Sequence, residues 1–422
     1  MYDAVIDEVD GRRIRIGREW FVDFASCNYL GFDLEPEIIA AIERELRRWG
    51  THPSWSRLLG SPRLYPEIEQ RLADLLGVSD TLVLPTITHI HMSAIPALVG
   101  TGQAFVDRSA HKTIFDGCRY AGGLGATVHR FAGLEQLHNL LRAAGGGRRL
   151  VCVDGVNSMT GNLPDLAELL SVCRGHGAVL YVDDAHGFGI VGERDVTETC
   201  DYGRRGNSIV RHLGECYDDL VLVGGFSKAY SALLAFIALP TDLKNYLKIA
   251  APPYLYSGPS PVASLAGVLA GFEINDARGD MLRQHLHRLT ARVLDHARNL
   301  GVATPNTSGI PIIEFPIVPG EDLTRVADEL WTRGIYATLA AYPLVPRAEA
   351  GFRVQLTAAH TDRDIDALNA AIGALAVNGM LRVARPGPAG SGTRAGLSGA
   401  VRPGEPCRCT RSPAAPDRHR SG

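Results

Sequence analysis

One lysine of this sequence stands where an amine could act as a nucleophile. Lys228 follows the apolar run 220–223 and two glycines, a pattern that predicts a buried strand ending at a turn. Desolvation favours the neutral form of an amine, and the neutral form is the one that attacks an aldehyde. Taken by itself, a solvated surface lysine is the alternative interpretation of Lys228.

A second apolar run ends in two carboxylates and a histidine. Asp183 and Asp184 follow residues 179–182, and His186 comes three residues after Asp183. A carboxylate that faces a pyridine nitrogen keeps it protonated, so that the ring withdraws electrons, and His186 could bond to a phenolic oxygen on that ring. The alternatives are a carboxylate that caps the strand end, or a carboxylate–histidine metal site whose further ligands are not supplied at local spacing.

Another histidine, His111, follows the apolar residues 104–106. Its ring could stack on an aromatic cofactor, although a lone histidine there is more often a capping or loop residue. Ligands of open parallel sheets bind beyond the carboxyl ends of the strands, so we expect these segments to converge. An amine for an aldehyde, a carboxylate for a ring nitrogen and a stacking ring are each of a type that pyridoxal 5'-phosphate (PLP) requires, and the set is compatible with PLP held as an imine on Lys228. We expect no metal.

The elements that must position these residues alternate between short apolar runs and amphipathic stretches. Continuous apolar strands separated by helices predict an α/β fold with a mostly parallel sheet covered on both faces. A segment rich in proline, tyrosine and serine near residues 252–261 marks the boundary to a smaller α+β domain. We expect the following divisions: an N-terminal segment over 1–45, a large PLP-binding domain over 46–260, a small C-terminal domain over 261–378, and a disordered basic tail over 379–422 that is too poor in large apolar residues to order itself.

The composition argues against several classes of protein. The 422 residues are 45% hydrophobic and 21% charged, with a formal net charge of -3, which gives no electrostatic footprint for nucleic acid. There is no run of about 18 apolar residues that would span a membrane, and the acidic N-terminus does not resemble a signal peptide. The 8 cysteines include no Cys-x-x-Cys pair and are expected to be reduced thiols. We therefore expect a cytoplasmic protein.

From about residue 24 to residue 375 the sequence resembles the α-oxoamine synthases. These are fold-type I PLP enzymes that include glycine C-acetyltransferase, 8-amino-7-oxononanoate synthase, 5-aminolevulinate synthase and serine palmitoyltransferase. The resemblance is carried by these blocks: Asn-Tyr-Leu-Gly at 28–31, Ser-Ala-His at 109–111, Asp-Gly-Val-Asn-Ser-Met-Thr-Gly at 154–161, Asp-Asp-Ala-His at 183–186, Phe-Ser-Lys-Ala-Tyr at 226–230, and Phe-Arg-Val-Gln-Leu-Thr-Ala-Ala-His at 352–360.

The resemblance implies a role for each of the residues that could do chemistry. Lys228 would form the imine, Asp183 would face the ring nitrogen, His186 the phenolic oxygen, and His111 would stack on the ring. These four are the implied catalytic residues, and all four would contact PLP.

The same blocks imply further contacts with cofactor and substrate. Ser158 and Ser227 would lie near PLP, and Arg353 would bind the carboxylate of the amino-acid substrate, a bidentate task suited to a guanidinium. Asn28, in the N-terminal block, is expected to contact the substrate.

The phosphate-binding segment departs from the family. The family has Gly-Phe-x-x-Asn at a helix N-terminus, where this chain has Pro-Thr-Ile-Thr-His-Ile-His at 85–91. Backbone amides at a helix N-terminus bind phosphate, so we expect Thr86 and Ile87 to contribute to this site. Gly225 replaces the family's threonine three residues before the lysine and removes one phosphate contact. The pair His89-x-His91 also fits a metal site, but a loop that replaces the phosphate cradle is the interpretation that we favour.

The activity that the resemblance implies is a decarboxylative condensation. A small amino acid and an acyl thioester, of coenzyme A or of an acyl carrier protein, would give an α-amino ketone, with Lys228 accepting the α-proton. The alternatives are an aminotransferase or an aldol-type lyase with the same cofactor, and a non-catalytic subunit of a heterodimeric synthase, against which the presence of Lys228 argues. The resemblance also implies a homodimer, with no nucleic-acid or membrane partner.

Overall fold

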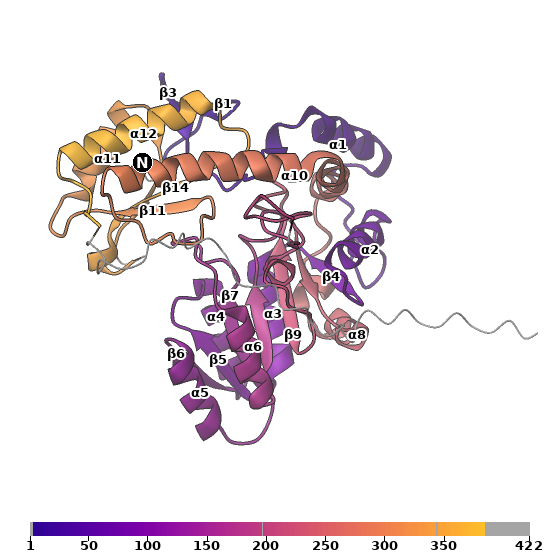
Figure 1. The fold of residues 1–422 in the computed structure, drawn as a ribbon. Coiled ribbons are helices and arrows are strands. Elements are labelled where there is room, and N and C mark those ends of the chain that lie inside the picture. Colours follow the sequence, from indigo (N-terminus) through magenta and orange to yellow (C-terminus); the bar gives the residue numbers. More distant parts are fainter. Residues whose placement is uncertain (1–2, 196, 343–344, 385–422) are drawn as a thin grey trace, which may run out of the picture.

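The computed structural model describes residues 3–195, 197–342 and 345–384 of the chain. A large sheet with its covering helices forms one end of the molecule, and two smaller sheets lie at the other (Figure 1). The long helix α10 (Val262–Asn299) begins beside the large sheet's helices and runs into the small end. We propose the start of α10 as the boundary between two domains, close to the predicted residue 260.

The large sheet is mostly parallel, as the continuous apolar runs predict. The one exception is β10, which pairs antiparallel with both of its neighbours. The strand order across the sheet is β4 (Thr81–Leu84), β10 (Ala235–Ala238), β9 (Leu220–Gly225), β8 (Val179–Asp183), β7 (Arg149–Asp154), β5 (Gln103–Asp107) and β6 (Thr127–Phe131).

Both faces of this sheet are covered, which explains why its central strands are mostly apolar. Successive residues of a strand point to opposite faces, so Leu180 and Val182 of β8 join one buried cluster and Tyr181 joins the other. The same alternation places Asp183 on the face of Tyr181. The helices of this domain are α2 (Leu64–Leu76), α3 (Ile87–Val99), α4 (Lys112–Gly123), α5 (Leu134–Ala143), α6 (Leu166–Gly175), α7 (Ile209–His212), α8 (Thr241–Ala250) and α9 (Pro252–Leu255).

The small end combines the C-terminal part of the chain with its N-terminal strands. Strand β3 pairs in parallel with β12, so residues far apart in the sequence share one sheet. The predicted capping box between Thr361 and Asp364 is present at the start of α12. The elements are β1 (Glu8–Asp10), β2 (Arg13–Ile16), β3 (Glu19–Asp23), η1 (Phe32–Leu34), β11 (Ile312–Pro316), α11 (Leu323–Thr332), β12 (Ile335–Tyr336), β13 (Thr338–Ala340), η2 (Arg347–Glu349), β14 (Gly351–Gln355) and α12 (Asp362–Val377). Helix α1 (Pro36–Trp49) lies instead beside α2 and the first half of α10 (Figure 1).

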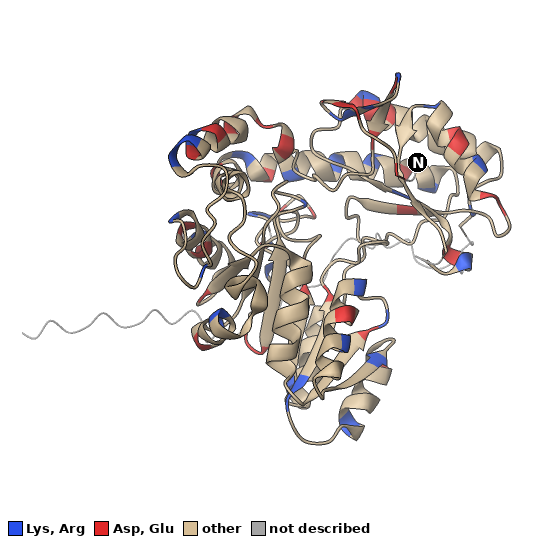
Figure 2. Cartoon of the chain, turned by 180° about the vertical axis from the view of Figure 1, so that it is seen from behind, with Lys and Arg blue, Asp and Glu red and all other residues tan. Residues whose placement is uncertain are grey.

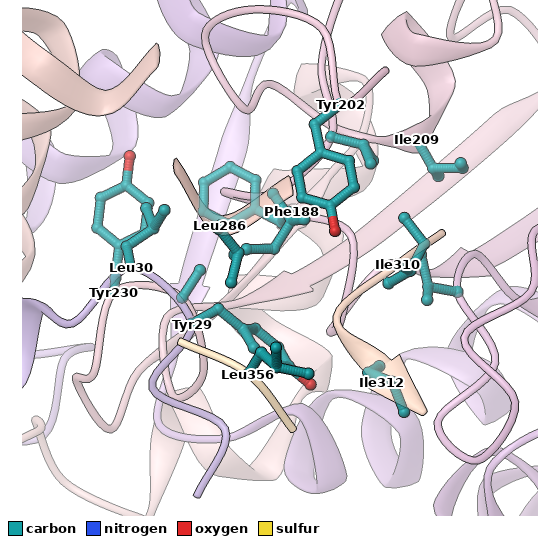
Figure 3. Packing of buried hydrophobic residues seen from close by; sticks show 14 of the residues in the cluster. Tyr29, Leu30, Phe188, Tyr202, Ile209, Tyr230, Leu286, Ile310, Ile312 and Leu356 are labelled. Carbon is teal, nitrogen blue, oxygen red and sulfur yellow. The ribbon is translucent and has the colours of Figure 1, made fainter. Parts of the chain in front are cut away.

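A continuous apolar core joins the two ends. Figure 3 shows Tyr29 of the N-terminal segment close to Leu356, with Leu286 of α10 and Phe188 of the large domain beside them. Within α10, the side chain of Arg283 is completely buried. Its guanidinium donates hydrogen bonds to the carbonyl oxygen of Gly189 (3.1 Å) and to side chains of α10 itself. The middle of α10 is therefore fixed against the segment that follows His186.

The described residues beyond position 379 still contact the small domain. Met380 and Leu381 are buried, and isolated bridges join Leu381 to Ile317 and Val383 to Val302. We therefore propose that the small domain extends a few residues past the predicted boundary at residue 379, because two apolar side chains still reach the core. The rest of the predicted tail, residues 385–422, lies outside the described residues.

The outer helices carry interspersed basic and acidic residues rather than a surface of one sign (Figure 2). An example is Arg71 of α2, which pairs at 2.7 Å with both Glu273 and Asp276 of α10. Exposed pairs of this kind contribute little stability individually. Across the described ranges, a helix of the length and apolarity needed to cross a membrane is not found.

Candidate active site

A cavity of about 320 Å³ lies at the carboxyl ends of the central strands. Its walls come from segments that follow β4, β5, β7, β8 and β9, which is where open parallel sheets bind ligands. The side chains that line it are Thr86, Ile87, Thr88, His111, Thr113, Asp154, Val156, Ser158, Asp183, Ala185, His186, Ser227, Lys228 and Leu233. Eight of the ten predicted site residues are thus brought together, and Asn28 and Arg353 are not among the lining residues.

Asp183 is held by residues on both sides of its carboxylate. Its Oδ2 lies 2.9 Å from Nε2 of His91 and its Oδ1 accepts a hydrogen bond from the backbone N–H of Ala185 (3.0 Å). Burial alone raises the pKa of this carboxyl, but the His91 imidazole, the Lys228 amine and the Ala185 N–H favour the charged form, so that the pKa of Asp183 is lowered. The cavity is therefore lined by an ionised carboxylate.

The neighbouring carboxyl, Asp184, points to the opposite face of the sheet. It is fully buried and accepts a hydrogen bond from the backbone N–H of Ile209 (2.9 Å). Burial raises the pKa of Asp184 well above its ordinary value. The alternation of β8 therefore assigns the two acids different surroundings, and only Asp183 faces the cavity.

His186 lies against the N-terminal segment. Its Nδ1 is 2.8 Å from the hydroxyl oxygen of Tyr29, which is also 3.2 Å from Oε1 of Gln355. Burial, together with the positive charges of Lys228 and Arg353, lowers the pKa of His186 well below its ordinary value. A neutral imidazole thus lines the cavity. Its Nδ1 contacts Tyr29, and its Nε2 does not take part in that contact.

His111 both caps a helix and lines the cavity. Its Nδ1 lies 2.8 Å from the hydroxyl of Thr113 at the start of α4, and its backbone N–H donates to Oδ1 of Asp154 (3.0 Å). Burial lowers the pKa of His111 although the charge of Asp183 opposes this shift. The capping role and the cofactor role considered for this residue are therefore compatible.

The segment 85–91 is not a loop, which corrects the prediction for it. Residues 87–91 form the first turns of α3, and the Thr86 hydroxyl caps the helix by accepting the backbone N–H of His89 (3.2 Å). The N–H groups of Ile87 and Thr88 precede the helical hydrogen-bond ladder and stand beside the cavity. The ring of His91 contacts Asp183 and Tyr181, and a group of three or more potential metal ligands is not found among the described residues.

The two remaining predicted residues sit next to the site rather than in its walls. Arg353 donates to the carbonyl oxygen of Ser158 (2.5 Å), a cavity residue, and lies 3.7 Å from Sδ of Met159. The Asn28 amide donates to Asp33 (2.9 Å) and so holds its own segment together.

The cavity fits the predicted cofactor, PLP. A phosphate finds free amides at the N-terminus of α3, where the helix dipole also favours an anion. The ionised Asp183 suits the ring nitrogen of PLP, and the amine of Lys228 suits its aldehyde. In the part of the chain that the structure describes, the buried Oδ2 of Asp154 has no hydrogen-bond partner, as expected of a wall that a polar ligand completes.

Two of the residues that build this site were missed in the sequence. His91 touches Asp183 from a helix that begins about ninety positions earlier, and Asp154 lines the wall at the end of β7. A signal for Asp154 existed, because it also follows a buried strand. For His91 the only signal was its place four residues after Ile87, on the same face of the helix.

The sequence matches the family Aminotransferase class I and II over residues 20–372. It is 33% identical over 368 residues to 8-amino-7-oxononanoate synthase of Stutzerimonas stutzeri, covering 86% of this chain and 90% of that one. A 25% identical serine palmitoyltransferase of Sphingomonas wittichii superposes with a TM-score of 0.81, over 89% of this chain and 92% of that one.

The fold also matches a serine palmitoyltransferase variant of S. paucimobilis solved with bound PLP, at a TM-score of 0.80 and 23% identity, over 89% of this chain and 94% of that one. The matches to an 8-amino-7-oxononanoate synthase and to serine palmitoyltransferases agree with the resemblance carried by the sequence blocks at 183–186, 226–230 and 352–360. The chain belongs to the aminotransferase class I and II family and, within it, to the α-oxoamine synthases.

Proposed function

We propose that this chain is a PLP-dependent acyltransferase that condenses a small amino acid with an acyl thioester, releasing carbon dioxide and a thiol and forming an α-amino ketone. The observation that supports this most is the convergence of Lys228, Asp183, His111 and His186 on one cavity. The relatedness to 8-amino-7-oxononanoate synthases, 33% identical over most of both chains, supports the same reaction class.

PLP, when bound, supplies an electron-withdrawing ring that stabilises negative charge on the α-carbon of the amino acid. The residues of the chain hold and move the protons that this chemistry requires. The Asp183 carboxylate keeps a proton on the ring nitrogen because its charged form is favoured by His91 and Lys228. The Lys228 amine accepts the α-proton, and His186 would lie beside the phenolic oxygen.

Binding and orientation fall to the remaining residues of the site. The imidazole of His111 packs against the ring, and Ser158 and Ser227 lie in the walls beside it. The N–H groups of Ile87 and Thr88, with the hydroxyl of Thr86, hold the phosphate at the N-terminus of α3.

The amino-acid substrate is held through its carboxylate. Arg353 stands beside Ser158 at the edge of the cavity, and a guanidinium binds a carboxylate through two parallel hydrogen bonds. For Asn28, which bonds Asp33, we propose contact with the substrate when it enters. The acyl donor is a thioester of coenzyme A or of a carrier protein.

We also propose that two copies of the chain associate. Large apolar side chains are exposed in two adjoining segments: Leu58 and Leu59 are 61% and 83% exposed, and Tyr256 is 81% exposed. The hydroxyl of Ser56 donates to the carbonyl oxygen of Leu255 (2.7 Å), which holds the two segments together. Large exposed apolar side chains gathered on adjoining segments are typical of an interface.

The activity is tested with the full chain loaded with PLP. A visible absorption band that borohydride bleaches is expected from the purified protein, and Lys228→Ala should lack it while keeping its circular-dichroism spectrum. Glycine, alanine and serine are then each incubated with coenzyme A thioesters and with carrier-protein thioesters. Release of free thiol and carbon dioxide in equal amounts supports condensation. A bleachable band without thiol release from any pair rejects condensation, and amino transfer to a keto acid would identify the reaction instead.

A further inference from the structure

His91 connects the ring-facing carboxylate to a buried tyrosine. Its Nε2 lies 2.9 Å from Oδ2 of Asp183, and its Nδ1 lies 2.8 Å from the hydroxyl oxygen of Tyr181. The side chains of His91 and Tyr181 are completely buried, and Asp183 is 5% exposed. Water therefore does not compete for these hydrogen bonds, and in such surroundings each bond is strong and orients its partners.

The directions of the two hydrogen bonds of His91 follow from its partners, Asp183 and Tyr181. Asp183 is ionised and can only accept, so Nε2 of His91 carries a hydrogen and donates it. Burial raises the pKa of Tyr181 well above its ordinary value, so its hydroxyl keeps its proton and donates to Nδ1. Tyr181 thereby fixes the orientation of the His91 ring, in the way that a hydrogen bond to one ring nitrogen commonly directs the other toward its partner.

Tyr181 and Asp183 lie on one strand, β8, and His91 contacts both of them from helix α3. Tyr181 and Asp183 are two residues apart on β8, so their side chains point to the same face of the sheet. His91 reaches both from α3, the helix whose first turn borders the cavity with Ile87 and Thr88. One helix therefore carries both the amides at the phosphate end and the imidazole at the ring-nitrogen end of the site.

We propose that His91, held by Tyr181, is the positioning residue that aims the Asp183 carboxylate at the ring nitrogen of PLP and keeps it ionised. This inference rests on the proposed function. The carboxylate that His91 orients carries the negative charge that would stabilise the proton on the ring nitrogen. His91 does not touch the reacting atoms itself and acts through Asp183.

The test measures PLP binding and the visible spectrum of the full chain, neither of which requires turnover. His91→Phe keeps a planar aromatic ring at this position but removes both hydrogen bonds. We expect the PLP concentration for half-saturation to rise about tenfold, the usual scale for removing the hydrogen-bonding partner of a ligand-binding group. The pH midpoint of the visible band should move upward, because a ring nitrogen without its proton no longer repels a proton on the Lys228 nitrogen.

A double-mutant cycle separates action through Asp183 from a general packing effect. Asp183→Asn alone should raise the half-saturating concentration and move the midpoint in the same direction, and adding His91→Phe should then change either value less than twofold. His91→Gln retains a donor near the position of Nε2 and should recover most of the loss. Equal effects of His91→Phe with and without Asp183→Asn would overturn the proposal.

Two further variants distinguish a specific effect of His91→Phe from a failure of that variant to fold. Tyr181→Phe deletes a single oxygen atom and should shift the midpoint in the same direction by a smaller amount. His89→Phe changes the same residue type on the same helix at an exposed position and should leave both readouts unchanged. If the unmodified protein shows no bleachable band, the proposed function fails. If that band is present and both His91→Phe and Tyr181→Phe leave it unmoved, only the role of His91 is rejected.

Discussion

Ile87 fills the space that a side chain at position 225 would occupy. A Cβ placed on Gly225 would lie 2.5 Å from Cδ1 of Ile87, which is closer than two non-bonded carbon atoms approach. The glycine at the end of β9 and the isoleucine at the start of α3 are thus complementary. This chain has glycine at position 225, where the family has threonine, and the bulk of the neighbouring Ile87 side chain explains the difference.

This complementarity predicts the outcome of restoring the threonine. Gly225→Thr alone should crowd Ile87 and lower the free energy of unfolding by about 1–3 kcal/mol, the usual cost of overpacking. Combined with Ile87→Ala, the same threonine should be accommodated and should bring a hydroxyl to the phosphate end of the cavity. Chemical denaturation and PLP titration of the four proteins of this cycle measure both effects.

Two comparisons decide whether the explanation holds. Gly225→Ala introduces the Cβ without the hydroxyl, so it should reproduce the crowding but not any gain in PLP affinity. Additive effects of Gly225→Thr and Ile87→Ala on stability would show that the two sites do not share space.

Replacing Arg353 by lysine should impair amino-acid binding more than the chemical steps. A lysine keeps the positive charge but cannot form two parallel hydrogen bonds to a carboxylate. Loss of one charge-assisted bond of about 1.5–3 kcal/mol raises KM for the amino acid about 10- to 100-fold, while kcat at saturation should change less. Arg363→Lys, at an exposed position of α12, is the matched control. An unchanged KM in Arg353→Lys would remove Arg353 from the substrate site.

His360 should make the protein sensitive to acid. Its Nδ1 accepts the backbone N–H of Thr357 (2.9 Å), and its Nε2 donates to the carbonyl oxygen of Asp23 (3.0 Å). Burial lowers the pKa of His360 from 6.5 to about 4, so below pH 6.5 the unfolded chain binds a proton that the folded chain refuses. The stability this residue contributes is complete above pH 6.5 and falls between pH 6.5 and about 4, by about 3 kcal/mol in total.

Urea denaturation at pH 7.5 and pH 5 measures this contribution. His360→Gln should be less stable than the unmodified protein at pH 7.5 but should lose about 2 kcal/mol less on going to pH 5. His89→Gln provides the exposed comparison and should follow the unmodified protein. Parallel pH dependence of the His360→Gln and unmodified proteins would contradict the assignment.

The exposed apolar patch formed by Leu58, Leu59 and Tyr256 should hold two copies together. Leu59→Asp combined with Tyr256→Asp buries two charges at the proposed contact, which is strongly unfavourable, and should convert a dimer into a monomer in sedimentation velocity experiments. Val377 on α12 is 86% exposed, so Val377→Asp makes a similar change elsewhere and should leave the dimer intact. A monomeric unmodified protein would exclude the interface.

The central strands and the meeting of their polar ends could be predicted from the sequence. Lys228, Asp183 and His111 each follow an apolar run, and parallel strands present their carboxyl ends at a common edge. Local pattern and topology are sufficient for that inference.

Other features depend on tertiary contacts that a local pattern does not contain. Strand β10 is only four residues long, and its antiparallel pairing with β4 and β9 rests on partners distant in the sequence. The contact between His91 and Asp183 depends on the rotation of α3 about its own axis relative to β8. A difference of one residue in that rotation would turn His91 away, and the spacing of histidines in the sequence does not reveal it.

Helix α10 ties the two halves of the enzyme mechanically. Its 38 residues make a rod about 57 Å long, and Arg283 clamps the rod to Gly189 near its middle. A displacement of the middle of α10 is therefore passed on to Gly189, which lies three residues beyond His186 in the chain. Movement of the long helix and loosening of the cavity wall at His186 are thus coupled in this architecture.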